Sequence, residues 1–219
     1  MGAFPRSPSW SARLVHGPGL LFIVSGPSGA GKDTLVDALR ERMPRLRYSV
    51  SATTRDPRAG EKEGEQYFFI SRPEFDRRRN EGGFLEWREY NGNLYGTPRD
   101  FVERTLAEGY DLIMKPEVNG ALAIKAAYSE AALIFLLPDK FSNLRERLVA
   151  RRTETTEEIA RRLEIAHREV QYIRQFDYIV INEQQRSDEA VRDLEALLHA
   201  EKFRIHRYPD ATLQKVEHS

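Results

Sequence analysis

The chain has no cysteine among its 219 residues. Disulfide frameworks and thiolate zinc sites are therefore excluded, and the absence suits a reducing compartment. No apolar run approaches the ~20 residues that a membrane-spanning helix needs. The first 19 residues also lack the unbroken apolar core of a signal peptide. The sequence thus predicts a soluble, cytoplasmic protein with a flexible leader at residues 1–19 and no membrane partner.

The chain also lacks an excess of charge of either sign, because 34 Lys and Arg residues balance 34 Asp and Glu residues. A zero net charge gives no reason to expect binding to nucleic acid or to an anionic membrane surface. Any basic site must therefore be local. The length favours one compact core that carries insertions, and it is compatible with a monomer or a homodimer.

Short apolar runs alternate with amphipathic stretches along most of the chain. Runs of this kind, separated by helical patterns, predict an α/β protein whose parallel sheet is covered by helices on both faces. The expected strands are residues 20–25, 47–50, 110–114, 132–137 and 178–181. The expected helices between them are residues 33–43, 117–127, 139–150 and 187–202.

Residues 51–100 interrupt this alternation. Two aromatic runs, YFFI and FLEWREY, flank a charged helix at residues 73–81, and a turn signal follows at residues 90–93. The segment therefore predicts a small mixed α+β insertion. A second, arginine-rich insertion is expected at residues 143–162. The core would then comprise residues 20–50, 101–142 and 163–204, followed by a tail at 205–219.

A phosphate-binding loop is predicted by the pattern G-x-x-x-x-G-K, which lies between an expected strand and an expected helix. Its glycines let backbone N–H groups face an anion, and the helix N-terminus adds partial positive charge. Lys32 would reach the β and γ phosphates of a nucleotide. The alternative is an ordinary glycine-rich turn. The predicted ATP-binding residues are Gly26, Pro27, Ser28, Gly29, Ala30, Gly31, Lys32, Asp33 and Thr34.

Asp33 occupies a position where a hydroxyl next to magnesium is usual. A carboxylate there is repelled by triphosphate unless the metal or its waters lie between them. Thr34 could supply the hydroxyl instead. We therefore expect Asp33 to hold a magnesium-bound water or to cap the helix, the alternative being a solvated residue in the first turn. Asp33 and Thr34 are the predicted Mg²⁺ contacts.

The insertion at residues 51–100 carries a second candidate anion site. Pro57 and Gly60 keep the segment that carries Arg55 and Arg58 out of a helix. The two guanidinium groups could therefore converge on one anion, with the Tyr67 hydroxyl as a further donor. The alternative is a pair of solvated surface arginines.

A candidate base pocket follows in the same insertion, in an alternating strand that contains Glu86. Its carboxylate could accept two parallel hydrogen bonds from the N1–H and the exocyclic amine of guanine, which adenine does not offer. A hydroxyl such as Thr97 or Ser51 could bind the guanine O6. Alternation places Glu86 opposite to both of its neighbours, which fits a pocket residue or a solvent-facing one.

Together these stretches resemble the guanylate kinase family of nucleoside monophosphate kinases, over about residues 20–200. The resemblance lies in GPSGAGK, SATTRDPRAGEKEGEQYFF, FLEWREYNGNLYGTP, GYDLIMKPEVNGA, RLVARRTETTEEIARRL and FDYIVIN. It implies a P-loop three-layer α/β/α fold with a five-stranded parallel core sheet, an inserted GMP-binding subdomain and a helical lid. It also implies ATP-dependent phosphorylation of GMP, and of dGMP, to the diphosphate with Mg²⁺.

The resemblance implies roles for individual residues. The GMP phosphate would be held by Arg55, Arg58, Tyr67 and Tyr95. Guanine would be bound by Ser51, Glu86 and Thr97. The lid arginines would be Arg147, Arg151 and Arg162, which with Lys32 stabilise charge on the transferring group. Glu117 could orient GMP, its arginines or a metal-bound water.

Two positions depart from the family pattern. Lys115 replaces the first acid of an acidic pair that follows the third core strand, and Glu117 retains the second. Asp33 also occurs in relatives that phosphorylate a phosphorylated ribose. The alternatives are therefore a ribose 1,5-bisphosphate kinase-like enzyme and a non-catalytic guanylate kinase-like binding module. The intact loop opposes the module, whereas Glu86 and Thr97 oppose a sugar substrate.

Overall fold

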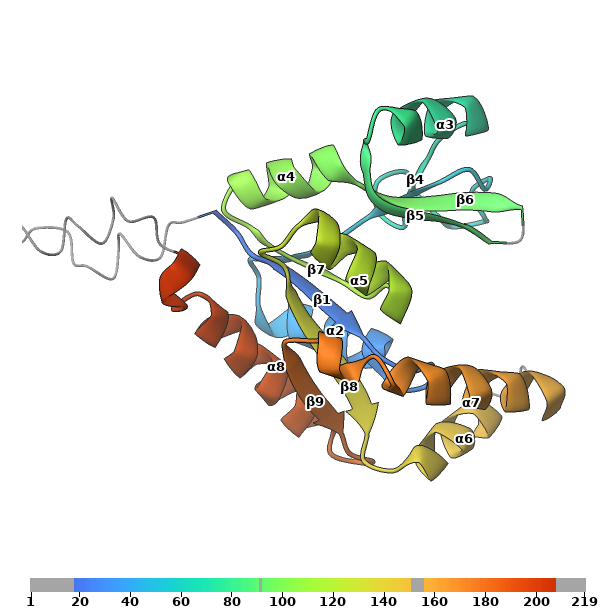
Figure 1. Cartoon of the computed structure of the whole chain (residues 1–219), viewed down its shortest axis with the longest axis vertical. Coiled ribbons are helices and arrows are strands. Elements are labelled where there is room, and N and C mark those ends of the chain that lie inside the picture. The colour runs from blue at the N-terminus through green and yellow to red at the C-terminus, as the bar shows by residue number, and fades with distance from the viewer. Residues whose placement is uncertain (1–17, 91, 151–155, 208–219) are drawn as a thin grey trace, which may run out of the picture.

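Figure 1 shows the computed structural model of the chain, in which residues 18–90, 92–150 and 156–207 are described. A five-stranded sheet forms the core, and all of its neighbouring strands are parallel. Its order is β2 (Leu46–Tyr48), β7 (Asp111–Met114), β1 (Leu21–Ser25), β8 (Ala132–Pro138) and β9 (Tyr178–Asn182). The predicted five-stranded parallel core is thus confirmed.

A second, four-stranded sheet lies within residues 51–98 and mixes parallel with antiparallel pairs. Its order is β4 (Tyr67–Phe69), β3 (Ser51–Thr53), β6 (Asn93–Pro98) and β5 (Phe84–Tyr90). Helix α3 (Arg72–Asn80) packs on it through Phe75, which stacks on Phe84. This is the mixed α+β insertion that the interrupted pattern predicts.

The remaining helices surround the core sheet. They are α2 (Lys32–Arg42), α4 (Arg99–Ala107), α5 (Val118–Ala127), α6 (Phe141–Ala150), α7 (Thr156–Val170) and α8 (Ser187–Glu201), with 3₁₀ turns η1 (Ile173–Gln175) and η2 (Ile205–Arg207). In the described part of the chain, no helix combines the length and apolar character needed to cross a membrane.

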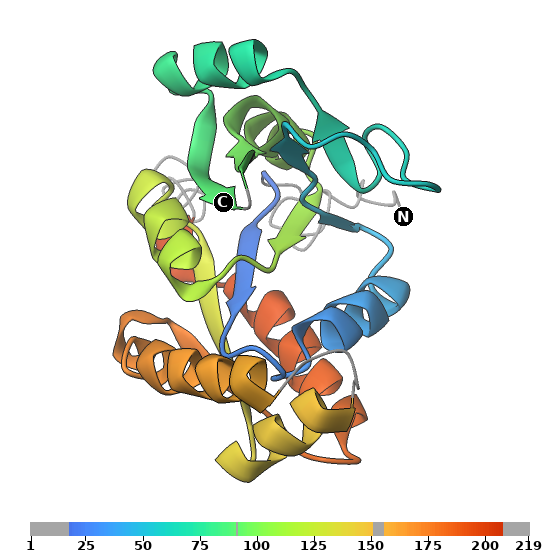
Figure 2. The ribbon, with the colours of Figure 1, turned by 90° about the vertical axis from the view of Figure 1, so that its right-hand side faces the viewer.

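The core sheet is buried because its strands carry apolar side chains toward both faces. Along β1, Phe22 and Val24 join the cluster that α2 and α8 cover, whereas Leu21 and Ile23 join the cluster that α4 and α5 cover. Figures 1 and 2 show these helix pairs on opposite faces of the sheet. A parallel strand covered on both sides has no polar face, which explains the continuous apolar run and confirms the three layers.

Two helices go beyond the sequence patterns. No helix is predicted at Arg99–Ala107, where α4 lies, although its buried residues Val102, Thr105 and Leu106 have helical spacing. Helix α7 runs unbroken across residues 162 and 163, where the lid is predicted to meet the core. That boundary therefore falls inside a helix, and the division into lid and core stays a prediction.

The carboxyl ends of β1 and β7 meet at one edge of the core sheet, since the two strands are parallel neighbours. The glycine-rich loop follows β1, and residues Lys115 to Glu117 follow β7. In Figure 2 the mixed sheet lies at one end of the molecule and the pair α6 and α7 at the other. Ligands of open α/β sheets bind outside the carboxyl ends of the strands, so this edge is where a site is expected.

Candidate active site

The loop after β1 adopts a conformation that depends on glycine. Gly26, Gly29 and Gly31 have φ angles of 139°, 88° and 97°, in the region that side chains other than glycine disfavour. A Cβ atom on Gly26 would also lie 2.2 Å from the carbonyl oxygen of Leu136 on β8. Close packing on β8 and the required backbone turn both exclude a larger residue there.

Lys32, the first residue of α2, curls back into this loop. Its Nζ donates to the carbonyl oxygens of Gly26, at 2.5 Å, and Pro27, at 3.1 Å. Burial lowers the pKa of Lys32, and the nearby carboxylates of Glu169 and Asp33 oppose that shift. The loop thus surrounds the ammonium group of Lys32. An anion held by the backbone N–H groups of the loop would therefore lie next to a positive charge.

Long-range contacts hold the loop from two further sides. The buried Asn182, at the end of β9, donates from Nδ2 to the carbonyl oxygen of Ala30 at 2.8 Å. Arg162 on α7 donates from Nη1 to the Ser28 hydroxyl at 3.3 Å. Of the predicted lid arginines, Arg162 is therefore at the loop, whereas the side chain of Arg147 and all of Arg151 lie outside the described residues.

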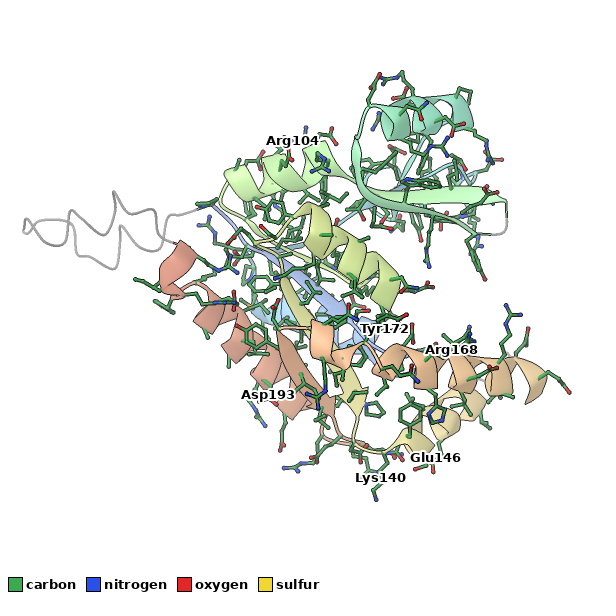
Figure 3. The ribbon with its side chains drawn as sticks, viewed as in Figure 1. Arg104, Lys140, Glu146, Arg168, Tyr172 and Asp193 are labelled. Carbon is green, nitrogen blue, oxygen red and sulfur yellow. The ribbon has the colours of Figure 1, made fainter. Side chains whose placement is uncertain are left out.

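Glu169 is a residue of α7 that the sequence patterns do not single out. Its carboxylate interacts with Lys32, burial raises its pKa, and its buried Oε2 has no hydrogen-bond partner among the described residues. By contrast, the neighbouring Arg168 is exposed on the same helix (Figure 3). The sequence does not distinguish these two adjacent charged residues; their different positions relative to the loop do.

Asp33 faces the other position that departs from the family pattern. Its Oδ1 lies 2.5 Å from Nζ of Lys115, and its side chain is 70% exposed. Gly31, not Asp33, occupies the N-cap position of α2, so the capping role expected for Asp33 is wrong in that respect. Thr34 is exposed in the same turn. The proposed contact of Asp33 and Thr34 with magnesium stays a prediction.

A cavity of about 440 Å³ lies between the mixed sheet and the carboxyl end of β7. Its size is that of a small-molecule site, and we call it the acceptor cavity. Most of the predicted GMP-binding residues line it, namely Ser51, Tyr67, Glu86, Tyr95, Thr97 and Glu117. Other lining residues are not predicted as contacts, among them Tyr48, Ser49, Arg88, Lys115, Asn119 and Gly120.

Glu86 is held in a fixed orientation on the wall of this cavity. The Thr97 hydroxyl donates to its Oε1 at 2.8 Å, and an ideal Cβ on Gly120 would lie 3.7 Å from its Oε2. Burial raises the pKa of Glu86, while Thr97 and the charge of Arg88 oppose the shift. Because a hydroxyl has one proton to donate, Thr97 here orients the carboxylate instead of offering that proton to a ligand.

The two arginines predicted for the phosphate are placed differently. Arg55 donates from Nη2 to both carboxylate oxygens of Glu61, at 2.8 and 3.0 Å, and its guanidinium lies 5.5 Å from the Tyr67 ring centre. Arg58 contacts Glu61 through its backbone N–H at 2.7 Å, and its side chain is exposed. Neither arginine lines the acceptor cavity. The predicted convergence of the two guanidinium groups on one anion site is therefore not seen.

Three cations, two that line the acceptor cavity and one beside its Tyr67 wall, each have a carboxylate partner. Arg88 Nη1 lies 2.5 Å from Glu117 Oε1, which adds a third pair to Arg55 with Glu61 and Lys115 with Asp33. Arg88 could have been found from the sequence, since it follows Glu86 by two residues and side chains of a strand alternate with period two.

Comparison with known proteins places this arrangement in a family. A family profile described as "Guanylate kinase" matches residues 19–201. A guanylate kinase from Caldanaerobacter subterraneus subsp. tengcongensis is 44% identical over 201 residues, which cover 92% of this chain and 97% of that protein. One from Thermus thermophilus is 48% identical over 193 residues, covering 88% and 86%.

The fold agrees with a solved structure. The crystal structure of guanylate kinase from Anaplasma phagocytophilum superimposes with a TM-score of 0.66 at 30% sequence identity. The match covers 87% of this chain and 90% of that one. The likeness therefore extends over most of both chains.

Proposed function

Because the chain belongs to the guanylate kinase family, we propose that it transfers the γ-phosphoryl group of ATP to GMP, and also to dGMP, to give the diphosphate. The observation that supports this most directly is the half-buried Glu86 carboxylate, oriented by Thr97 in a cavity at the carboxyl end of β7. A fixed carboxylate is complementary to the N1–H and exocyclic amine of guanine and mismatched to adenine.

The acceptor cavity and the phosphate loop are neighbours, as direct transfer between two nucleotides requires. Lys115 lines the cavity and pairs with Asp33 in the first turn of α2, so the two sites share a border. Phosphoryl transfer requires positioning and positive charge, and no covalent intermediate on the protein. Lys32 and the lid arginines Arg147, Arg151 and Arg162 are proposed to supply that charge.

The other two functions are not favoured. A non-catalytic binding module would not require an intact phosphate loop. Here the loop encloses Lys32 and is held by hydrogen bonds from Asn182 and Arg162. A ribose bisphosphate offers only single hydroxyl donors to the half-buried Glu86 carboxylate, whereas guanine offers two parallel N–H donors that match both of its oxygens. The relatives found by sequence and the solved structure found by fold are also guanylate kinases.

Magnesium is proposed to arrive with ATP. Within the described ranges, no three His, Asp or Glu side chains gather as a metal cage, and Mg²⁺ on nucleotides typically keeps waters and phosphate ligands with few from the protein. Asp33 and Thr34 at the start of α2 would contact its waters, and the ion would neutralise charge on the phosphates. A cytoplasmic location and a monomeric or homodimeric state stay predictions.

An activity screen tests the proposal. The purified chain is given ATP and Mg²⁺ with GMP, dGMP, AMP or ribose 1,5-bisphosphate, and ADP and the phosphorylated acceptor are measured. We expect kcat/KM for GMP to exceed that for AMP by at least ~10³-fold, since a site built around a polar group rejects a mismatched ligand strongly. Preferred use of the ribose compound, or no transfer to any acceptor, would overturn the proposal.

A further inference from the structure

Lys115 has surroundings that tie it to both nucleotide sites. It lines the acceptor cavity, its ammonium lies 2.5 Å from Oδ1 of Asp33, and it lies 5.1 Å from the ring centre of Tyr48. Its side chain is 21% exposed, against 70% for Asp33. The largely buried ammonium group of Lys115 thus lies between the wall of the acceptor cavity and the exposed carboxylate of Asp33.

The backbone that carries Lys115 is fixed. Met114, the last residue of β7, pairs with Ile23 of β1, and the carbonyl oxygen of Pro116 accepts a hydrogen bond from the buried Ser25 hydroxyl at 2.8 Å. Residue 115 is therefore anchored on both sides to the strand that leads into the phosphate loop. Its positive charge also acts on Lys32 and contributes to lowering the pKa of Lys32, which places two cations near each other.

The ion pair with Asp33 is suited to exchange. A carboxylate that is 70% exposed is well solvated, and solvent screens its attraction for the ammonium group. A phosphate carries more charge and more acceptor oxygens, so it competes effectively for the same ammonium group. The Tyr48 ring lies beside the ammonium group in a cation–π contact that does not depend on the carboxylate of Asp33.

We propose that Lys115 is a further catalytic residue. Its ammonium group dissociates from Asp33 and binds a non-bridging oxygen of the phosphoryl group while that group passes from the phosphate loop to the acceptor cavity. The proposal rests on the proposed function. The bond between the γ-phosphorus and the oxygen of ADP breaks as a bond to the acceptor's phosphate oxygen forms. Lys115 keeps its protons throughout and contributes charge only. Asp33 is a positioning residue that holds the ammonium group between turnovers.

The simpler alternative is that the pair only ties β7 to α2. In that case, removal of either partner would lower thermal stability by a similar amount and leave transfer almost intact. A catalytic role separates the partners, because Asp33→Asn leaves the ammonium group available and Lys115→Met removes it. The two variants therefore distinguish a tie from a cation that contacts the substrate.

The test measures kcat, KM for GMP and Tm for wild type, Lys115→Met, Lys115→Arg and Asp33→Asn. We expect Lys115→Met to lower kcat by ~100-fold, because one donor to transition-state charge typically carries that much, with KM for GMP changed less than ~5-fold. Lys115→Arg should recover most of the lost rate. At saturating Mg²⁺, which offsets the proposed contact of Asp33 with magnesium-bound water, Asp33→Asn should lose at least ~10-fold less than Lys115→Met. Lys62→Met, which removes an exposed lysine of the insertion, is the charge control.

Binding of a dinucleotide in which five phosphates join adenosine to guanosine gives a second readout. Lys115→Met should weaken its binding by ~10-fold or more while GMP alone binds within ~3-fold of wild type. A Lys115→Met enzyme with kcat within ~3-fold of wild type, or equal losses in Lys115→Met and Asp33→Asn at saturating Mg²⁺, would overturn the proposal. Failure of the wild type to phosphorylate GMP would instead overturn the proposed function.

Discussion

The loop that faces the donor and the cavity that faces the acceptor hold their cations in different ways. On the donor side, Lys32 is half-buried and bonded to carbonyl oxygens of its own loop. On the acceptor side, Arg55, Arg88 and Lys115 are each paired with a carboxylate. Backbone carbonyls stay in place when a ligand binds, whereas side-chain carboxylates can move away. The donor site is thus preformed before ATP binds. In the acceptor site, a phosphate can replace the carboxylate partner of each cation.

The largest effect is expected at the fixed cation. Lys32→Met should lower kcat by at least ~10³-fold, because it removes the ammonium group that meets the transferring phosphoryl group. GMP binding should persist, since the acceptor cavity does not include Lys32. Steady-state kinetics and calorimetric titration with GMP measure both. Arg168→Met, on the exposed side of α7, is the control. Loss of GMP binding in Lys32→Met would mean that the two sites are not separate.

Next in size is the base-reading residue. Glu86→Gln should lower kcat/KM for GMP by ~10²- to 10³-fold and leave AMP use unchanged, because an amide cannot accept both guanine donors. Burial raises the pKa of Glu86, so GMP use by the wild type should decline on acidification at a higher pH than an ordinary glutamate would give. Glu86→Gln should lack this decline. An unchanged preference for GMP over AMP in the variant would refute the assignment.

The two arginines of one segment form a matched pair. Arg55→Ala should raise KM for GMP by ~10- to 100-fold, because its guanidinium lies beside Tyr67 and can release Glu61 for a phosphate. Arg58→Ala should raise it at most ~5-fold, since an exposed side chain pays more to be ordered. Initial rates at varied GMP measure both. Equal losses would show that Arg58 moves to the phosphate on binding, as the family resemblance implies.

The smallest effect concerns stability. The hydrogen bond from Arg55 lowers the pKa of Glu61 below the ordinary value of a glutamate. A carboxyl whose pKa is depressed on folding stabilises the fold above its unfolded pKa, and this is lost as pH falls through its folded pKa. Glu61→Gln should therefore lower Tm at pH 7 by less than ~3 °C, and the difference should shrink in acid. A difference that does not depend on pH would contradict the assigned charge.

The parts of the molecule that the sequence predicts correctly depend on neighbours in the chain. The strands of the core sheet are apolar runs, and the loop from Gly26 to Lys32 is one contiguous pattern. Helix α4 is missed although its buried residues Val102, Thr105 and Leu106 have helical spacing, because the segment is short and follows the insertion directly. A helix of this length is stabilised mainly by packing on β7 and the mixed sheet.

The candidate site divides in the same way. Glu86 and Thr97 are predicted separately, and the fold joins them by a hydrogen bond between β5 and β6. The expected side-by-side placement of Arg55 and Arg58 fails, because Glu61 accepts a side-chain bond from one and a backbone bond from the other. Sequence spacing gives the distance along the chain, and it does not give the partner that a charged side chain selects.

By itself, the sequence determined the alternation of strands and helices, the phosphate loop and the residue types of the acceptor cavity, because these follow from local periodicity and from motifs of adjacent residues. Only the tertiary structure decided that Asp33 and Lys115 pair with each other. They are far apart in the chain and meet because β1 and β7 are parallel neighbours whose carboxyl ends share one edge. Electrostatic partners are set by distance in space, which folding alone establishes.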